Sequence, residues 1–157
     1  SNKINNIKKW LNFGADQTFK SYGIEIVEFI KDGFEDDIID NLRNTLLEKM
    51  GNNHIDFFNN LEISFSTNKY LFVHAGIDPL KSLSDQTKKD YLWSRSNNFF
   101  HEDFMSKKII VHGHTPVENI TNHPYRINVD TGCYFSGNLS CVCLSDTNES
   151  RNFLSIL

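Results

Sequence analysis

The residues best suited to do chemistry are two histidines that follow apolar runs. His74 closes the run "KYLFVHAG", and His114 lies in "KIIVHGHTP", each within two residues of a glycine and in a turn that ends at a proline. Glycine turns at strand ends let the backbone approach a ligand closely. Imidazoles delivered from neighbouring strand ends are good nitrogen ligands for a transition metal. The pattern predicts a metal site, against the alternative that both histidines pack within a core.

An arginine strengthens the prediction of a ligand site. The segment "YLWSR" places Arg95 two residues after Trp93, beyond the loop that follows His74. The planar guanidinium suits a phosphate or a carboxylate because its donors form a fork. The simpler alternative is a solvated surface arginine.

The order of several motifs is informative beyond any one of them. The segments "FVHAGIDP", "LWSR", "VHGHTP" and "INVDTGC" follow one another, after an opening "KKWLNFGADQTFKSYG". This succession resembles the carboxyl-terminal part of the phosphoprotein phosphatase family. That family comprises bacterial-type serine/threonine phosphatases and their diadenosine tetraphosphatase relatives, within the calcineurin-like metallophosphoesterases. The resemblance covers essentially the whole chain.

The resemblance implies roles for particular residues. His74 and His114 would both ligate the second of two metals, and Arg95 would hold phosphate oxygens. Tyr134 would reach the mouth of the cleft, and Asp130 would be a structural residue near the site. His112 is expected to be structural, and the remaining histidines match no motif and are expected at the surface or in packing: His54, His101 and His123.

The resemblance also implies a reaction. A phosphatase of this family hydrolyses phosphate monoesters of serine and threonine by in-line attack of a hydroxide that bridges two divalent metals. Manganese is the expected metal, with iron or zinc as alternatives, because imidazole and carboxylate ligands suit these ions. Hydrolysis of dinucleoside tetraphosphates is the alternative activity, so the substrate is either a phosphorylated protein or a nucleotide.

The chain departs from the family in its first half. The motifs Gly-Asp-x-His-Gly, Gly-Asp-x-x-Asp-Arg-Gly and Gly-Asn-His-Glu/Asp do not occur, and "GNNHID" at Gly51–Asp56 is no substitute because it lies in the segment leading to His74. Residues 1–157 are therefore expected to be the carboxyl-terminal portion of one metallophosphoesterase catalytic domain. We expect this chain alone to be inactive and to bind one metal weakly or none. A different alternative is an inactive remnant that acts as a binding module, and exposed sheet edges or apolar faces would favour self-association.

Composition excludes several other classes. The net charge is −4 and 39% of the 157 residues are hydrophobic, which indicates a globular protein without the basic face of a nucleic-acid-binding protein. No apolar run is long enough to span a membrane. The three cysteines suggest reduced thiols in the cytoplasm, with Cys141 and Cys143 facing one side of a strand, into a core.

The expected fold is α/β, with an α+β appearance within this chain, as part of the calcineurin-like metallophosphoesterase sandwich. Helices are predicted over the first sixty residues and a largely antiparallel sheet over the rest. Turns are expected at Thr67-Asn68, between two hairpin strands, and as a tight hairpin loop at Ser136–Asn138. The predicted strands lie within "LEISFS", "KYLFVHA", "KIIVHG", "YRINVDTG", "LSCVCLS" and "FLSIL".

Overall fold

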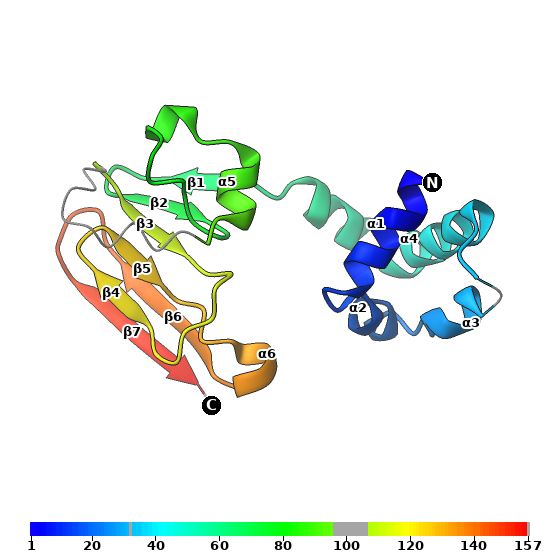
Figure 1. Cartoon of the computed structure of the whole chain (residues 1–157). Coiled ribbons are helices and arrows are strands. Elements are labelled where there is room, and N and C mark those ends of the chain that lie inside the picture. Colours follow the sequence, from blue (N-terminus) through cyan, green and yellow to red (C-terminus); the bar gives the residue numbers. More distant parts are fainter. Residues whose placement is uncertain (32, 96–106, 157) are drawn as a thin grey trace. The chain divides into compact units, whose positions relative to one another are not determined.

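The computed structural model describes residues 1–31, 33–95 and 107–156. The chain divides into two compact units, Ser1–Leu61 and Glu62–Leu157 (Figure 1). The first unit contains helices and the second contains the described strands, as the sequence predicts. The predicted mixture of helix and sheet is thus confirmed.

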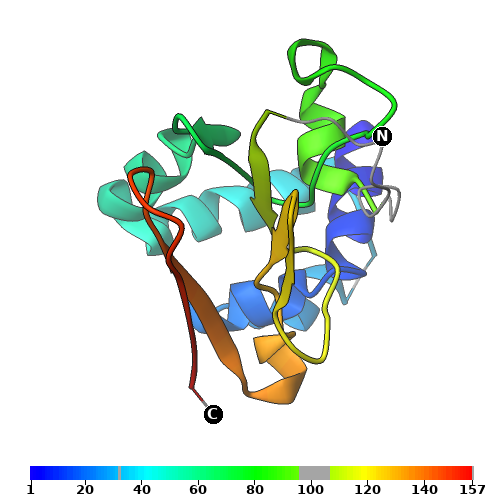
Figure 2. The same ribbon diagram turned by 90° about the vertical axis from the view of Figure 1, so that its left-hand side faces the viewer.

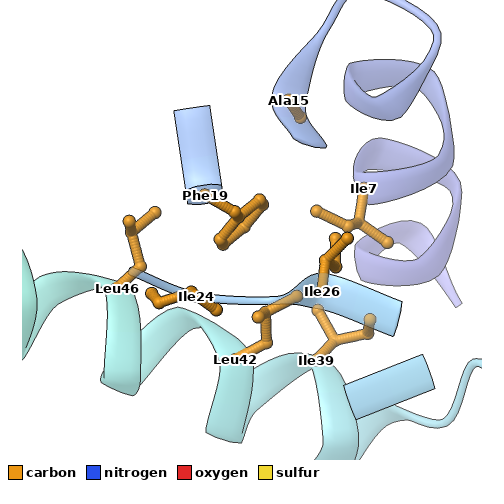
Figure 3. Packing of buried hydrophobic residues seen from close by; sticks show 8 residues of the cluster. All are labelled: Ile7, Ala15, Phe19, Ile24, Ile26, Ile39, Leu42 and Leu46. Carbon is orange, nitrogen blue, oxygen red and sulfur yellow. The ribbon is translucent and has the colours of Figure 1, made fainter. Parts of the chain in front are cut away.

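The first unit is a cluster of helices held by one apolar core. The helices are α1 (Asn2–Leu11), α2 (Ala15–Ser21), α3 (Ile26–Ile30) and α4 (Asp36–Asn59). Ile39, Leu42 and Leu46 recur along α4 at helical spacing and are buried, as the apolar stripe predicts. Figure 3 shows them packed around the Phe19 ring together with the other buried side chains: Ile7, Ala15, Ile24 and Ile26.

Two glycines shape this unit where the backbone turns. Gly14 has a φ of 85° and separates α1 from α2, a conformation that a side chain would oppose. Gly51, with φ of 68° and ψ of 169°, interrupts the helical path of α4. The element α4 therefore consists of two helical stretches that meet at a kink.

The second unit contains a five-stranded sheet in the order β1-β2-β3-β5-β4. Its strands are β1 (Ser64–Ser66), β2 (Tyr70–Val73), β3 (Ile109–His112), β4 (Thr121–His123) and β5 (Arg126–Asn128). The predicted hairpin of β1 and β2 is confirmed, since they pair antiparallel. The elements outside this sheet are η1 (Leu83–Asp85), α5 (Lys88–Trp93), α6 (Cys133–Ser136) and the paired strands β6 (Leu139–Leu144) and β7 (Arg151–Ile156).

The prediction of a largely antiparallel sheet is wrong at the centre of this sheet. Strand β3 pairs parallel to β2 on one side and to β5 on the other. The long connection from β2 to β3, which contains α5, brings the chain back to the starting end of the sheet. Strand β4 runs back along the outer edge, antiparallel to β5, so β5 again points the same way as β3.

Both faces of the five-stranded sheet are covered. On one face Leu71 and Ile110 pack with Ile77 and with Tyr91 of α5. On the other face, Tyr70, Val111 and Ile127 pack against side chains of β6, which lies with β7 beside the sheet (Figure 2). The central strands are therefore buried on both sides, which is typical of parallel strands.

Two smaller predictions about the last strands are wrong. Cys141 and Cys143 are exposed, because the residues that alternate with them, Val142 and Leu144, face the five-stranded sheet. The segment Ser136–Asn138 is not a hairpin loop. It contains the end of α6, which is capped by Gly137 with a φ of 74°. Strand β6 pairs with β7, so the hairpin turn lies at residues 145–150.

Within the described ranges, none of the helices combines the length and the apolar character needed to cross a membrane.

Candidate metal and phosphate site

The two candidate histidines meet because they follow neighbouring parallel strands. His74 comes directly after β2, and His114 comes two residues after β3. Parallel strands end at the same edge of a sheet, so the residues after them converge there. A backbone hydrogen bond from Gly113 N–H to the His74 carbonyl, at 2.9 Å, ties the two turns together.

The side chains of His74 and His114 form a close pair. Nε2 of His74 lies 3.0 Å from Nδ1 of His114, within hydrogen-bonding distance. The ring centroids are 4.8 Å apart and the ring planes are inclined at 58°. Nε2 of His114 is buried and has no hydrogen-bond partner among the described residues. A buried imidazole nitrogen without a partner is costly, and such a nitrogen is available to a ligand.

The turn that carries His114 is strained and tightly packed. His114 has a φ of 68°, the left-handed region that few residues other than glycine adopt. Thr115 N–H donates to the Gly113 carbonyl at 2.8 Å, which closes the turn. A Cβ atom at Gly113 would lie 3.1 Å from Cβ of Asp130, so the segment after β5 presses against this turn.

Asp130 and its neighbours form a hydrogen-bonded support beside the turn. The Asp130 carbonyl accepts a hydrogen bond from Val117 N–H at 2.9 Å. One carboxylate oxygen of Asp130 accepts from Gly132 N–H at 2.9 Å. Thr131 is buried and donates its hydroxyl hydrogen to the Asn138 carbonyl at 2.7 Å. The predicted structural role of Asp130 agrees with these contacts.

Helix α5 delivers Trp93 and Arg95 to the same place. A capping box begins the helix, in which the Thr87 hydroxyl accepts from Asp90 N–H and the Asp90 side chain accepts from Thr87 N–H. Ala75, next to His74, donates its N–H to the Tyr91 carbonyl at 2.7 Å, which docks α5 on the turn after β2. Trp93 then meets His114 edge to face, with ring centroids 5.7 Å apart and planes at 87°.

The surroundings of His114 lower the pKa of its imidazole. Partial burial is the largest cause of the lowered pKa of His114, and the positive charge of Arg95 and the neighbouring His74 lower it further. The negative charge of Asp130 acts in the opposite direction but does not prevail. A neutral imidazole is the form that binds a metal.

A pocket of about 320 Å³ lies along α5 and is lined in part by Trp93, the residue whose ring contacts His114. Asp78 and Asp90 both pair with Lys81, with N–O distances of 3.5 and 2.8 Å. Lys89 and Arg95 bring two further positive charges to the lining of this pocket. The pocket is lined by Asp78, Lys89, Asp90, Trp93, Ser94 and Arg95.

The remaining predicted residues lie elsewhere. His112 is 4% exposed at the end of β3, where burial lowers its pKa to about 4. A ring nitrogen of His54 lies 2.8 Å from the Tyr22 hydroxyl in the helical unit, and His123 lies in β4. Tyr134 lies on α6, is 88% exposed and packs edge-on against Phe135, so its place in a cleft stays a prediction. His101 lies outside the described residues.

The pair fits a metal as part of a ligand set. Both side chains are imidazoles, and the nitrogens that face each other, Nε2 of His74 and Nδ1 of His114, lie 3.0 Å apart, so both would be the ligand atoms for a shared metal. The described ranges contain no group of three His, Cys, Asp or Glu side chains that could hold a metal. Catalytic metal sites generally use at least three protein ligands. These residues could supply two ligands, and further ligands are needed for a complete centre.

Sequence reasoning did not assign a role to two residues near the pair. Trp93 provided context for Arg95, yet its contact with His114 depends on how α5 docks. Asn128 was not singled out, although it is fully buried and hydrogen-bonded to two turns. A polar residue inside the apolar strand "YRINV" was the available signal.

Comparison with models of known protein families gives no match, and no curated protein matches the sequence significantly.

Proposed function

We propose that this chain belongs to a metal-dependent phosphatase that hydrolyses phosphate monoesters of serine and threonine in proteins. In this proposal it contributes two imidazole ligands and one phosphate-binding arginine. The observation that carries the proposal is the 3.0 Å approach of His74 to His114 at the ends of parallel strands, with the charge of Arg95 acting on His114.

The three residues have complementary tasks. His74 and His114 would hold a divalent metal, which supplies an activated water and neutralises phosphoryl charge when bound. Arg95 would hold two phosphate oxygens through its fork of donors and orient the ester. Trp93 packs against the His114 ring, with the two ring planes at 87°.

The chain carries only part of the machinery in this proposal. Its sequence lacks the aspartate and asparagine motifs that would complete the metal centre. We therefore expect no turnover of an aryl phosphate by this chain with manganese. Turnover that His114→Ala abolishes would contradict the proposed incompleteness and would show that the chain completes its own site.

Phosphate binding tests the proposal without requiring turnover. Calorimetric titration of orthophosphate in the presence of Mn²⁺ should detect binding that weakens about tenfold in Arg95→Gln, the loss of roughly 1.4 kcal/mol. Arg43→Gln is the matched control, since it removes the same charge from the exposed surface of the other unit. Equal affinities in the two variants, or no manganese-dependent binding by the unmodified chain, would overturn the proposal.

The pocket beside α5 favours a second candidate, hydrolysis of dinucleoside tetraphosphates. Trp93 is 54% exposed and lines this pocket with Lys89 and Arg95. An aromatic face beside two cations suits a nucleobase and its phosphates. In a Trp10→Phe background, quenching of Trp93 fluorescence by diadenosine tetraphosphate but not by a phosphoserine peptide would favour this candidate, and the reverse would favour the phosphoprotein.

A further inference from the structure

Asn128 lies where the two turns of the candidate site come together. It is the last residue of β5, is 0% exposed, and stands opposite His112 in the register of the parallel pair. His114 and Asp130 lie two residues beyond these partners on their respective turns. A fully buried amide must satisfy its donors and acceptors within the protein.

The Asn128 side chain uses both ends of its amide on these turns. Its Nδ2 donates to the Thr115 carbonyl at 2.8 Å, directly after His114. Its Oδ1 accepts from Asp130 N–H at 3.0 Å. One rigid side chain thus links the turn after β3 to the turn after β5.

The link acts on the one described non-glycine residue that has a positive φ. His114 has a φ of 68°, a conformation that non-glycine residues leave unless their surroundings hold them there. The hydrogen bond from Asn128 holds the carbonyl of Thr115, one peptide beyond His114, and so anchors the far side of this turn. If the turn were released from this anchor, Nδ1 of His114 would move away from Nε2 of His74.

We infer that Asn128 is a positioning residue, which holds the strained turn of His114 so that its imidazole faces His74 and a shared metal. The metal in this inference rests on the proposed function. The geometry of the two histidines can be measured whether or not the chain hydrolyses a substrate. Aspartate lacks the Nδ2 donor, and serine is too short to span both turns. In this inference Asn128 holds the two turns by the hydrogen bonds of its amide and not by filling space.

The test compares Asn128→Asp and Asn128→Ser with Ile127→Val, which trims the buried neighbour in β5 and leaves the amide in place. Nitrogen-15 NMR of the histidine rings reports the hydrogen bond between His74 and His114 directly. We expect both Asn128 variants to lose the ring signals of this hydrogen bond, and Ile127→Val to keep them. Unchanged ring signals in a folded Asn128→Ser protein would overturn the inference.

The affinity of the imidazole pair for Mn²⁺ provides a second measurement. Broadening of the two imidazole signals by Mn²⁺ should need about tenfold more metal in Asn128→Ser than in Ile127→Val, as is usual when a supporting residue is removed. If the unmodified chain binds no Mn²⁺ at the pair, the proposed function fails, and the ring signals still decide the role of Asn128.

If the Asn128 variants fail to fold, combining them with His114→Gly still tests the inference. Glycine adopts a positive φ without strain, so a glycine at position 114 would no longer need the hydrogen bonds of Asn128 to hold the turn. If Asn128 serves to hold His114, His114→Gly should restore folding to Asn128→Asp and shrink the loss of stability caused by Asn128→Ser. Additive losses, or no rescue, would mean that Asn128 supports the sheet alone.

Discussion

His74 and His114 are forty residues apart in the sequence, yet their ring nitrogens Nε2 and Nδ1 lie 3.0 Å apart. The approach depends on β2 and β3 being parallel neighbours, because an antiparallel pair would place the two following turns at opposite edges. The same edge receives Trp93 and Arg95 from α5 and the Asn128 clamp from β5. Two further stretches of sequence therefore support one pair of imidazoles.

The first prediction concerns the charge of Arg95. Arg95→Gln should raise the pKa of His114 toward its ordinary value, because a nearby positive charge that disfavours the imidazolium is removed. Proton NMR titration of the His114 ring measures this directly. Lys89→Gln is the control, since it removes a charge from the same pocket and is expected to have the smaller effect. An unchanged His114 pKa in Arg95→Gln would contradict the placement of Arg95.

The second prediction concerns acid stability and His112. Burial lowers the His112 pKa from 6.5 to about 4, so the unfolded chain binds the proton more readily than the folded one. This contribution is fully present above pH 6.5 and is lost as the pH falls to 4. At about 1.4 kcal/mol for each pKa unit, the loss is about 3 kcal/mol.

Urea unfolding at several pH values, followed by Trp93 fluorescence in a Trp10→Phe background, measures this dependence. His112→Gln should flatten the profile between pH 4 and 6.5, the range set by the two pKa values. A profile with the same slope in His112→Gln as in the unmodified chain would contradict the role of His112.

The third prediction concerns the two glycines that flank α6. Gly132 and Gly137 have φ values of 67° and 74°, so alanine at either position should cost roughly 1 kcal/mol of unfolding free energy. A Cβ at Gly132 would also lie 2.2 Å from the ring of Phe135, whereas nothing lies within 4 Å of one at Gly137. Phe135 is exposed and can swing away, so we expect only about 1 kcal/mol more for Gly132→Ala.

Chemical denaturation of both alanine variants checks this order. In a Phe135→Ala background, Gly132→Ala should lose its additional cost in unfolding free energy, so that alanine costs the same at Gly132 and at Gly137. Equal losses for the two single variants would mean that the Phe135 ring does not restrict the backbone of Gly132.

The helices and strands were largely predictable because their patterns are local. The stripe of Ile39, Leu42 and Leu46 predicts α4 at helical spacing, and the buried runs ending near His74 and His114 predict β2 and β3. Helix α3 is only five residues long and has no side-chain cap, which explains why its sequence carries little signal.

Strand direction and the exposed cysteines were not predictable in the same way. A short apolar run such as "IIVH" suits a parallel or an antiparallel strand equally well. Cys141 and Val142 are both compatible with a buried position, so the strand alone does not tell which of its faces meets the sheet. These choices are made by contacts between distant segments, such as Val142 with the cluster around Ile127.

The candidate site was predictable in its residue types but not in its support. A histidine within two residues of a glycine, after an apolar run, marks His74 and His114. The positive φ of His114 and the hydrogen bonds of the Asn128 amide depend on tertiary packing. Whether the pair serves a phosphatase stays a prediction, which metal binding can test.

The most direct test of the central claim is a titration of the histidine-labelled chain with Mn²⁺, followed by paramagnetic broadening of each imidazole signal. We predict that His74 and His114 broaden together at metal concentrations that leave His54 and His123 unaffected, and that His114→Ala removes the effect at His74. Uniform broadening of all four rings, or none at the pair, would contradict a metal site between the ends of β2 and β3.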